Sequence, residues 1–196
     1  MRKYALMIAV VFLWGTFTTA VQARNYDRVI NMQDISGEDI GVLVEEDERV
    51  LVLNTKIHDN RKGIYVMKGG HLTIMNSIVR DNDEEGIDIR ENTMVRIYRN
   101  FIYNNGESGV ETEGDGVNVK INKNVILKNK HGITVQFRKG EDGYVRIGEN
   151  DVDKNDEFGL RCNAPLPEAS MDDDYYADVI SLRGDLDDKI DDECDL

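Results

Sequence analysis

Short segments of alternating apolar and polar residues recur along this chain, and five of them begin with a glycine-apolar-x-apolar tetrad. The tetrads start at Gly63, Gly86, Gly109, Gly132 and Gly159. Their spacing is 23, 23, 23 and 27 residues. An asparagine precedes each glycine by three or four positions, at Asn60, Asn82, Asn105, Asn129 and Asn155. A repeat of this length predicts a stacked fold in which each repeat contacts mainly its neighbours.

Each repeat contains a second alternating segment and a single aliphatic anchor. The second segments cover residues 50–52, 72–74, 95–97, 119–121 and 145–147, and the anchors are Ile57, Val79, Ile102, Ile126 and Val152. Alternation turns the first and third residues of a strand inward and the middle residue toward solvent. We therefore predict an all-β, single-stranded parallel β-helix of about five to six coils, with a C-terminal tail capping the last coil. A further, degenerate coil begins at Gly41, 22 residues before Gly63.

Two corner features follow from this fold. Stacked asparagines pass hydrogen bonds from coil to coil and tolerate left-handed backbone angles, so we expect the five asparagines to form a ladder. The tetrad glycines are expected to supply the positive φ of a sharp corner. Leucine-rich repeats have a similar length but require a leucine-dense consensus, and propeller blades need about 40 residues or more.

The units Asn-Phe-Ile-Tyr-Asn-Asn at residues 100–105 and Asn-Val-Ile-Leu-Lys-Asn at residues 124–129 are characteristic. Together with the Gly-Ile-x-Val tetrads, they resemble the right-handed parallel β-helix repeat family, the pectate-lyase-like superfamily. The resemblance covers residues 41–162, and the right-handed winding is what it implies. It selects no activity, because the family spans lyases, hydrolases, epimerases and non-catalytic surface proteins.

The segments on either side of the repeats indicate export. Residues 1–23 have Arg2 and Lys3, an apolar stretch and a small-residue end at Ala23, which is typical of a secretory signal peptide. The alternative, a membrane anchor, is disfavoured because the apolar run is shorter than the ~20 residues that a bilayer requires. We therefore expect a signal peptide at 1–23, an N-terminal cap segment at 24–40, the β-helix domain at 41–163 and an acidic C-terminal tail at 164–196. The mature chain is expected to be secreted or periplasmic, without a membrane span.

The chain has only two cysteines, Cys162 and Cys194. An even number in an exported chain predicts one disulfide, which here would fasten the tail across the last coil. The alternative is two free thiols, with Cys162 a small core residue.

Charge excludes one class of partner. The chain has 24 basic and 38 acidic residues and a net charge of −14. The stretch from Glu168 to the end holds 12 acidic and 2 basic residues, so the tail carries much of the excess. We expect no nucleic-acid partner, because that binding needs a basic surface that displaces phosphate counterions.

Candidate binding residues lie on the outward side of the tetrad strands. The middle position is occupied in turn by Tyr65, Asp88, Glu111, Thr134 and Arg161. Stacking makes Asp88 and Glu111 neighbours, which repel unless a cation, a proton or the nearby Arg90 compensates. This face suits a hydroxyl-rich or uronic-acid chain, with candidate substrate-binding residues Glu85, Asp88, Glu111, Glu113 and Gln136. The alternative is an ordinary polar surface, since charged outward positions are expected on any half-exposed strand.

The resemblance implies a chemistry for the same face. Polysaccharide lyases of the superfamily hold calcium with carboxylates and use an arginine or lysine as the base. By analogy, Asp88, Glu111 and Glu113 would be calcium ligands, and Arg90 or Arg161 would be the base. Hydrolases of the superfamily carry three aspartates and a His-Gly pair, of which only His131 with Gly132 has a counterpart. Polygalacturonase-type hydrolysis is therefore disfavoured, and His131 is a candidate catalytic residue or a mere corner residue.

Two further sides are distinctive. One bears Thr73, Arg96, Lys120 and Arg146, with Arg99 and Lys123 nearby. This basic stripe suits an acidic glycan or the chain's own acidic tail. The other bears Ile78, Phe101 and Val125, flanked by Tyr103 and Leu127, and predicts lateral self-association or cover by a terminal segment unless the corner buries these residues.

The sequence favours an exported, non-catalytic module that interacts with carbohydrate. The first alternative is a calcium-dependent polysaccharide lyase or epimerase acting on uronic-acid glycans. The second is a structural module that associates through its apolar side. The few coils and short connections disfavour an enzyme, because the known enzymes of the family generally have more coils and long loops that wall a cleft.

Overall fold

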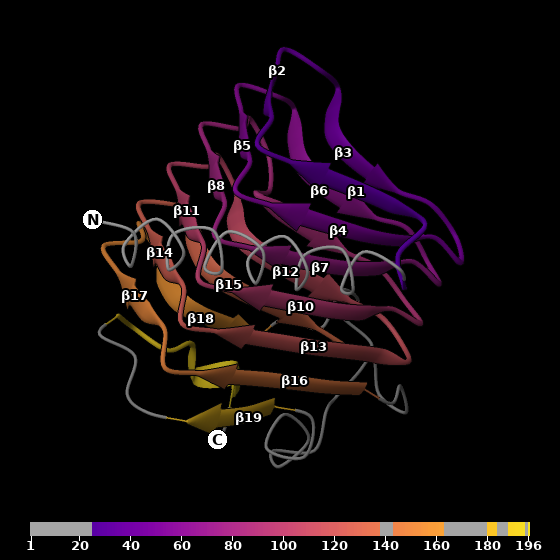
Figure 1. Ribbon diagram of the computed structural model, residues 1–196. Coiled ribbons are helices and arrows are strands. Elements are labelled where there is room, and N and C mark those ends of the chain that lie inside the picture. Colours follow the sequence, from indigo (N-terminus) through magenta and orange to yellow (C-terminus); the bar gives the residue numbers. More distant parts are fainter. Residues whose placement is uncertain (1–24, 138–142, 163–179, 184–187, 195) are drawn as a thin grey trace, which may run out of the picture.

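The structure is a computed structural model that describes residues 25–137, 143–162, 180–183, 188–194 and 196. The predicted signal peptide at residues 1–23 lies outside the described residues. In the described part, 19 short strands and one 3-10 helix follow one another along the chain. Figure 1 shows the strands wound into coils that stack from the N-terminal end, in indigo, to β19, in yellow.

Three parallel sheets form the sides of the rod, and every coil contributes one strand to each sheet. Sheet A runs β1 (Arg28–Asn31), β4 (Arg49–Leu53), β7 (His71–Met75), β10 (Met94–Tyr98), β13 (Val117–Asn122), β16 (Gly143–Gly148) and β19 (Ile180–Arg183). Sheet B runs β2 (Asp34–Ser36), β5 (Lys56–His58), β8 (Ile78–Arg80), β11 (Phe101–Tyr103), β14 (Val125–Leu127) and β17 (Asp151–Asp153). Sheet C runs β3 (Ile40–Val44), β6 (Lys62–Val66), β9 (Ile87–Ile89), β12 (Ser108–Glu113), β15 (His131–Gln136) and β18 (Phe158–Cys162).

The prediction of an all-β parallel β-helix of about five to six coils is confirmed. The first coil starts within residues 24–40, because β1 and β2 already pair with β4 and β5. At the other end, β19 comes from the C-terminal tail and pairs with β16, so the tail adds a strand to sheet A.

The core is a set of aliphatic columns inside the rod. In sheet C, for example, Ile64, Ile87, Val110, Ile133 and Leu160 stand in register on consecutive coils, and none has any exposed surface. Burying each such side chain contributes about 1.5–3 kcal/mol relative to leaving it in water. The alternation of the sequence therefore determines which residues face the inside of the rod, and each further coil adds to the stabilisation by burial.

The tetrad glycines are required for close approach rather than for a positive φ. A Cβ on Gly109 would lie 2.8 Å from both Asn129 Nδ2 and Gly132 O, closer than side-chain carbons come. The expectation of positive φ at these glycines is wrong, because the same corner places its left-handed residue earlier, at Asp81 or Asn104, for example. The glycine makes room for the backbone and the amide of the next coil.

The asparagine ladder runs through the corner between sheets B and C. Each side-chain amide donates to the side-chain oxygen of the asparagine in the following coil, over N···O distances of 2.8–3.1 Å. The same oxygen accepts the backbone N–H of the preceding asparagine. The ladder comprises Asn60, Asn82, Asn105, Asn129 and Asn155, all buried. It satisfies backbone groups that the turn would otherwise leave unpaired in the interior.

A second ladder occupies the corner between sheets A and B, and the sequence reasoning missed it. Asn100 donates to Asn124 over 3.0 Å, and Asn124 donates to Asn150 over 2.9 Å. In earlier coils, Ser77 and Thr55 take the equivalent position. The residue type at this position varies, so the sequence pattern did not reveal the ladder, although its spacing is as regular as that of the first one.

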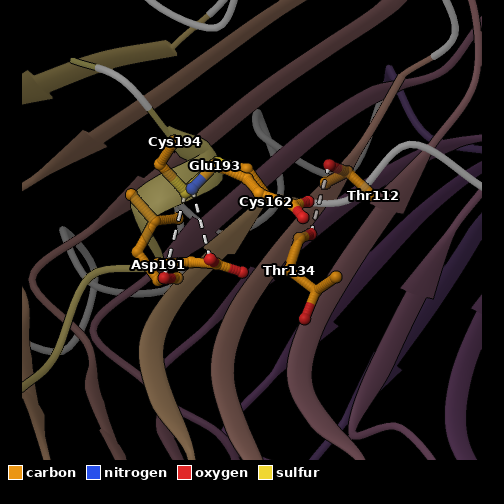
Figure 2. The surroundings of a disulfide bond; sticks show 7 residues. Thr112, Thr134, Cys162, Asp191, Glu193 and Cys194 are labelled. Carbon is orange, nitrogen blue, oxygen red and sulfur yellow. Dashed lines mark hydrogen bonds between the residues drawn. A yellow bond between two sulfur atoms is a disulfide. The ribbon is translucent and has the colours of Figure 1, made fainter. Parts of the chain in front are cut away.

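The disulfide between Cys162 and Cys194 is present, with the two Cα atoms 4.9 Å apart and both residues buried (Figure 2). Cys194 lies in the 3-10 helix η1 (Asp192–Cys194), and its N–H donates to the carbonyl of Asp191. Just before it, Ile190 forms a parallel bridge with Leu160 of β18. The C-terminal residues therefore cover the open edge of the last coil, which would otherwise present unpaired strand groups to solvent.

Candidate functional site

The candidate site lies on the outer face of sheet C. Strand pairing places Tyr65, Asp88, Glu111, Thr134 and Arg161 in one column, each beside the next. Gln136 pairs with Glu113 on the same side of the sheet, two residues further along their strands than Thr134 and Glu111. We call the outer surface of strands β6, β9, β12, β15 and β18 the polar face.

The expectation that this column faces solvent is wrong for two of its members. Asp88 and Thr134 have no exposed surface, whereas Tyr65, Glu111 and Arg161 are half-exposed. Lys62 lies against Asp88, and the Ser108 hydroxyl lies 2.7 Å from that of Thr134. Long side chains from neighbouring positions thus cover an outward residue, which strand alternation by itself does not reveal.

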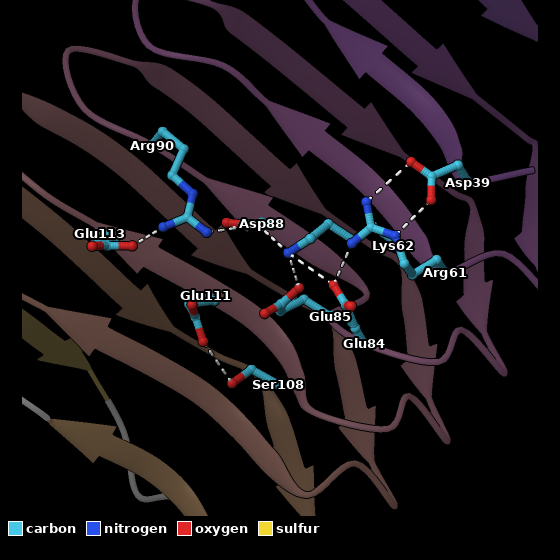
Figure 3. A network of polar contacts seen from close by, with 10 residues as sticks. All are labelled: Asp39, Arg61, Lys62, Glu84, Glu85, Asp88, Arg90, Ser108, Glu111 and Glu113. Atoms are coloured by element: carbon cyan, nitrogen blue, oxygen red, sulfur yellow. Dashed lines mark hydrogen bonds and ion pairs between the residues drawn. The ribbon is translucent and has the colours of Figure 1, made fainter. Parts of the chain in front are cut away.

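Lys62 and Arg90 compensate the carboxylates (Figure 3). The Lys62 ammonium lies 2.6 Å from Asp88 Oδ2 and also donates to Glu85. Arg90 Nη2 lies 3.0 Å from the same Asp88 oxygen, while Arg90 Nη1 pairs with Glu113. Three of the predicted binding residues are therefore held in ion pairs within the protein.

The network continues toward the N-terminal coils through residues that the sequence reasoning did not include. Glu84 contacts both Lys62, at 3.3 Å, and Arg61, at 2.7 Å. Arg61 in turn lies 2.6 Å from Asp39. Lys62 and Glu85 occupy the same position before the tetrad glycine in consecutive coils, a signal that could have paired them.

Burial and ion pairing compete in setting the pKa values here. Burial disfavours the charged ammonium of Lys62, but hydrogen bonds to Asp88 and Glu85 outweigh it and raise the pKa of Lys62. For Asp88, burial dominates and raises the pKa of the carboxyl, although Arg90 and Lys62 act in the opposite direction. For Glu85, burial is outweighed by hydrogen bonds from Lys62 and Glu107, and the pKa of Glu85 is lowered.

Glu111 is the least neutralised carboxyl of the polar face. Its one hydrogen bond to a described residue comes from the Ser108 hydroxyl, over 3.3 Å. Burial, reinforced by the negative charges of Glu85 and Asp88, raises the pKa of Glu111 to about 7. A half-exposed carboxyl that exchanges its proton near neutral pH can donate or accept a hydrogen bond, and such groups are common at functional sites.

His131 is a buried residue of β15, in register with Ser108 of β12. Arg161 donates to His131 Nε2 over 3.0 Å, and the Phe158 ring stacks on the imidazole with 5.9 Å between centroids. Burial, together with the charge of Arg161, lowers the pKa of His131. With Nε2 accepting, the proton of the neutral ring sits on Nδ1, which is buried without a hydrogen-bond partner among the described residues.

The predicted calcium ligands do not fit a calcium ion as they are placed. Asp88 and Glu113 are occupied by Lys62 and Arg90, whereas calcium requires six to eight oxygen ligands. In the described part of the chain, no group of three or more His, Cys, Asp or Glu side chains is arranged to hold a metal. Calcium binding stays a prediction, and no chemical step is derived from it.

The other two sides carry the groups that the pattern predicted. The basic stripe is formed by Arg96, Lys120 and Arg146, which are in register on β10, β13 and β16. On sheet B, Phe101 is 40% exposed and packs edge-on against Tyr103 at 5.0 Å between centroids, while Ile78 and Val125 are half-buried. Self-association through this side stays a prediction.

Three parallel sheets stacked coil by coil around an aliphatic core define a β-helix protein. Residues 8–152 match the family described as "right handed beta helix region", and the chain belongs to this family. No curated protein matches the sequence.

Among solved structures, the chain resembles the periplasmic alginate epimerase AlgG and a double mutant of it. The TM-scores are 0.58 for AlgG and 0.61 for the mutant, at 14% and 16% identity. The alignments cover 79% and 80% of this chain but only 38% and 39% of the epimerase chains. This likeness shows the fold. Within the described residues, no helix is long and apolar enough to cross a membrane.

Proposed function

We propose that this protein is an exported carbohydrate-binding β-helix that holds a polysaccharide segment on the polar face of sheet C. The observation that carries the proposal is Glu111, a half-exposed carboxyl at the centre of that face with a pKa of about 7. When protonated, such a group contacts sugar hydroxyls, or the carboxylate of a uronic acid, without charge repulsion.

The surroundings of Glu111 support a hydroxyl-rich ligand. Tyr65 is a half-exposed ring, with Lys62 and Arg90 each 5.8 Å from its centroid, and can stack on the flat side of a sugar. Gln136 and Arg161 add half-exposed donors on the next coils. Because Lys62 and Arg90 already neutralise nearby carboxylates, the polar face offers many hydrogen-bonding groups with little net repulsion.

A uronic-acid polysaccharide is the proposed ligand class. Two solved structures that resemble this chain are described as alginate epimerases, and alginate is a polymer of uronic acids. The chain spans less than half the length of those proteins, so their activity does not transfer with the fold. A secreted or periplasmic location is part of the proposal. The disulfide supports it, because such bonds persist in oxidising compartments.

Binding is tested by titrating the protein with defined oligomers of mannuronate, guluronate, galacturonate and glucose in a calorimeter. Glu111→Ala is expected to weaken binding of the preferred uronate oligomer by about tenfold, because truncation leaves hydrogen-bonding groups of the ligand unpaired. Glu193→Ala, an exposed carboxylate on η1, is the matched control. If no oligomer binds, or if Glu111→Ala and the control bind alike, the proposal is refuted.

A second candidate is an epimerase or lyase, and the pKa of Glu111 is the observation that favours it. Glu111, as carboxylate, would remove the proton next to the sugar carboxyl. Return of a proton to the opposite side would give the epimer, whereas loss of the 4-linked oxygen would give an unsaturated uronate. For Arg90, burial is outweighed by the charge of Asp88, which raises the guanidinium pKa, so Arg90 stays protonated and is a poor base.

Incubation with polyuronates in deuterated water separates the two candidates. Deuterium in the recovered polymer indicates epimerisation, and a rise in ultraviolet absorbance indicates elimination. Either signal, lost in Glu111→Gln, supports the enzyme. Binding without either signal supports the non-catalytic module.

A further inference from the structure

Sheet A differs from the other two sheets in its charge. Its seven strands, as the structure describes them, contain no aspartate or glutamate, although the chain has 38 such residues. Each of the other two sheets has three. The cations of sheet A are Arg28, Arg49, Arg96, Lys120, Arg146 and Arg183. A protein with a net charge of −14 therefore keeps one side free of strand carboxylates.

Among the described residues, no carboxylate compensates the basic stripe at the centre of this sheet. Arg96 pairs in register with Lys120, and Lys120 with Arg146, so the cations follow one another at about 4.8 Å along the rod. Arg96 and Lys120 are exposed, and Arg146 is half-exposed. None of the three forms an ion pair or side-chain hydrogen bond with a described residue. Lys62 and Arg90 of the polar face, in contrast, are held by carboxylates.

An uncompensated column of like charges has an energetic cost. Like charges directly opposite each other on neighbouring strands destabilise a sheet. Folding does not require this repulsion, because on the polar face the same chain pairs its cations with carboxylates. An external anion would remove the repulsion, and the spacing is on the scale of one sugar unit.

The groups beside the stripe suit a sugar polymer. Tyr98 and Asn122 are paired on one flank, and Asn118 and Tyr144 on the other. Tyr144 is 38% exposed, and phenol rings with amides offer stacking surface and hydrogen bonds to sugar hydroxyls. At the N-terminal end of the stripe, the same face has a groove of about 490 Å³. Its lining includes Tyr26, Arg49, His71, Thr73, Met94 and Arg96.

We propose that Arg96, Lys120 and Arg146 form a second binding site, on the outer face of sheet A, for an anionic polysaccharide that runs along the rod with about one acidic group per coil. The site is separate from the polar face and does not rest on the function proposed for it. Anionic polysaccharide is favoured over nucleic acid because a single sugar strand can follow a column of three cations, whereas nucleic-acid binding needs a broader basic surface, which a chain with a net charge of −14 does not supply.

The test uses the full exported chain and a fluorescent oligouronate whose anisotropy reports binding. Replacing Arg96, Lys120 and Arg146 together by glutamine is expected to weaken binding about tenfold or more, because three exposed charge contacts with the ligand are lost at once. Wild-type binding is expected to weaken as salt is added. The matched control removes the same charge elsewhere, with Lys56→Gln, Lys68→Gln and Lys130→Gln. Glu111→Ala is measured in parallel, since it disturbs only the polar face.

Weaker binding in the stripe variant alone, with unchanged melting temperature, supports the proposal. Equal binding by the stripe variant and the control overturns it. So does tighter binding of single-stranded DNA than of the oligouronate. A lower melting temperature of the stripe variant at low salt, with unchanged oligouronate binding, assigns the stripe to the chain's own acidic tail and also overturns it. If only Glu111→Ala loses binding, the oligouronate binds at the polar face and not at the stripe, and the proposal is overturned.

Discussion

Asp188 occupies the position that the next asparagine would hold in the buried ladder above Asn155. Its Oδ2 accepts the backbone N–H of Asn155 over 2.9 Å and the Asn155 side-chain amide over 3.2 Å. A carboxylate only accepts hydrogen bonds, so the ladder ends there without leaving an amide donor unpaired. The acidic tail therefore closes both the ladder and, through Cys194, the last coil.

Replacing Asp188 tests this closing role. Asp188→Ala is expected to lower the free energy of unfolding by about 1–3 kcal/mol, because two donors of Asn155 lose their acceptor. Asp188→Asn keeps a side-chain oxygen and is expected to cost less. Urea denaturation measures both, with the exposed Asp192→Ala as control. Equal stability of Asp188→Ala and the control would contradict the role.

Removing the disulfide is expected to destabilise the fold by roughly 3 to 4 kcal/mol, since the bond closes a loop across a sequence separation of 32 residues. The measurement is chemical denaturation of the wild type with and without reductant, compared with Cys162→Ala/Cys194→Ala. Mass spectrometry establishes the redox state. If reductant leaves the wild-type midpoint unchanged, the cap holds without the bond and this expectation is wrong.

Breaking the buried contact between Lys62 and Asp88 is expected to cost about 3 kcal/mol in Lys62→Met, because Asp88 then keeps a buried charge with only Arg90 beside it. Adding Asp88→Asn to that variant is expected to restore part of the loss. Thermal and urea unfolding of the four proteins of this double-mutant cycle give the coupling. Lys68→Met, at an exposed lysine, controls for the loss of one cation. Additive effects would show that the two residues do not act as a pair.

The pKa of Glu111 predicts a pH-dependent stability. Its folded-state value of about 7 lies above the ordinary 4.5, so the folded protein binds the proton more tightly than the unfolded chain does. This contribution is complete below pH 4.5 and is lost as the pH rises to about 7. Glu111→Gln is expected to reduce the decline and to be more stable than the wild type at pH 8. Urea unfolding between pH 4.5 and 8 measures it, with Glu193→Gln as control. A parallel decline in Glu111→Gln and the wild type would assign the effect to another group.

Calcium is expected to leave the melting temperature unchanged, because Lys62 and Arg90 occupy the carboxylates that the family resemblance assigned to the ion. Magnesium at the same concentration controls for ionic strength. A rise in melting temperature specific to calcium, and abolished in Glu113→Gln, would instead restore the calcium site.

The repeat itself determined the rod, its inner columns and the first asparagine ladder. Those features depend on spacing alone: residues one period apart must stack, so Asn82 reaches Asn105 and Ile87 reaches Val110. The same reasoning from spacing also predicted that Asp88 and Glu111 are neighbours. It failed for the second ladder, where Ser77 and Asn100 share a role but not a side chain, and for Asp188, which follows Asn155 outside the repeat period.

Only the tertiary structure decided which outward residues are covered. Strand alternation assigns a side of the sheet, but burial depends on how far a neighbouring side chain extends and toward which charge it turns. Lys62 therefore buries Asp88, whereas Lys120, a stripe cation on a sheet whose described strands lack carboxylates, stays exposed and forms no ion pair with a described residue. Spacing in the chain thus specified which residues stack. The pKa of Glu111, the ion pairs of Asp88 and Glu113 and the charge contrast between sheets A and C arise from side chains that meet only after the coils have stacked.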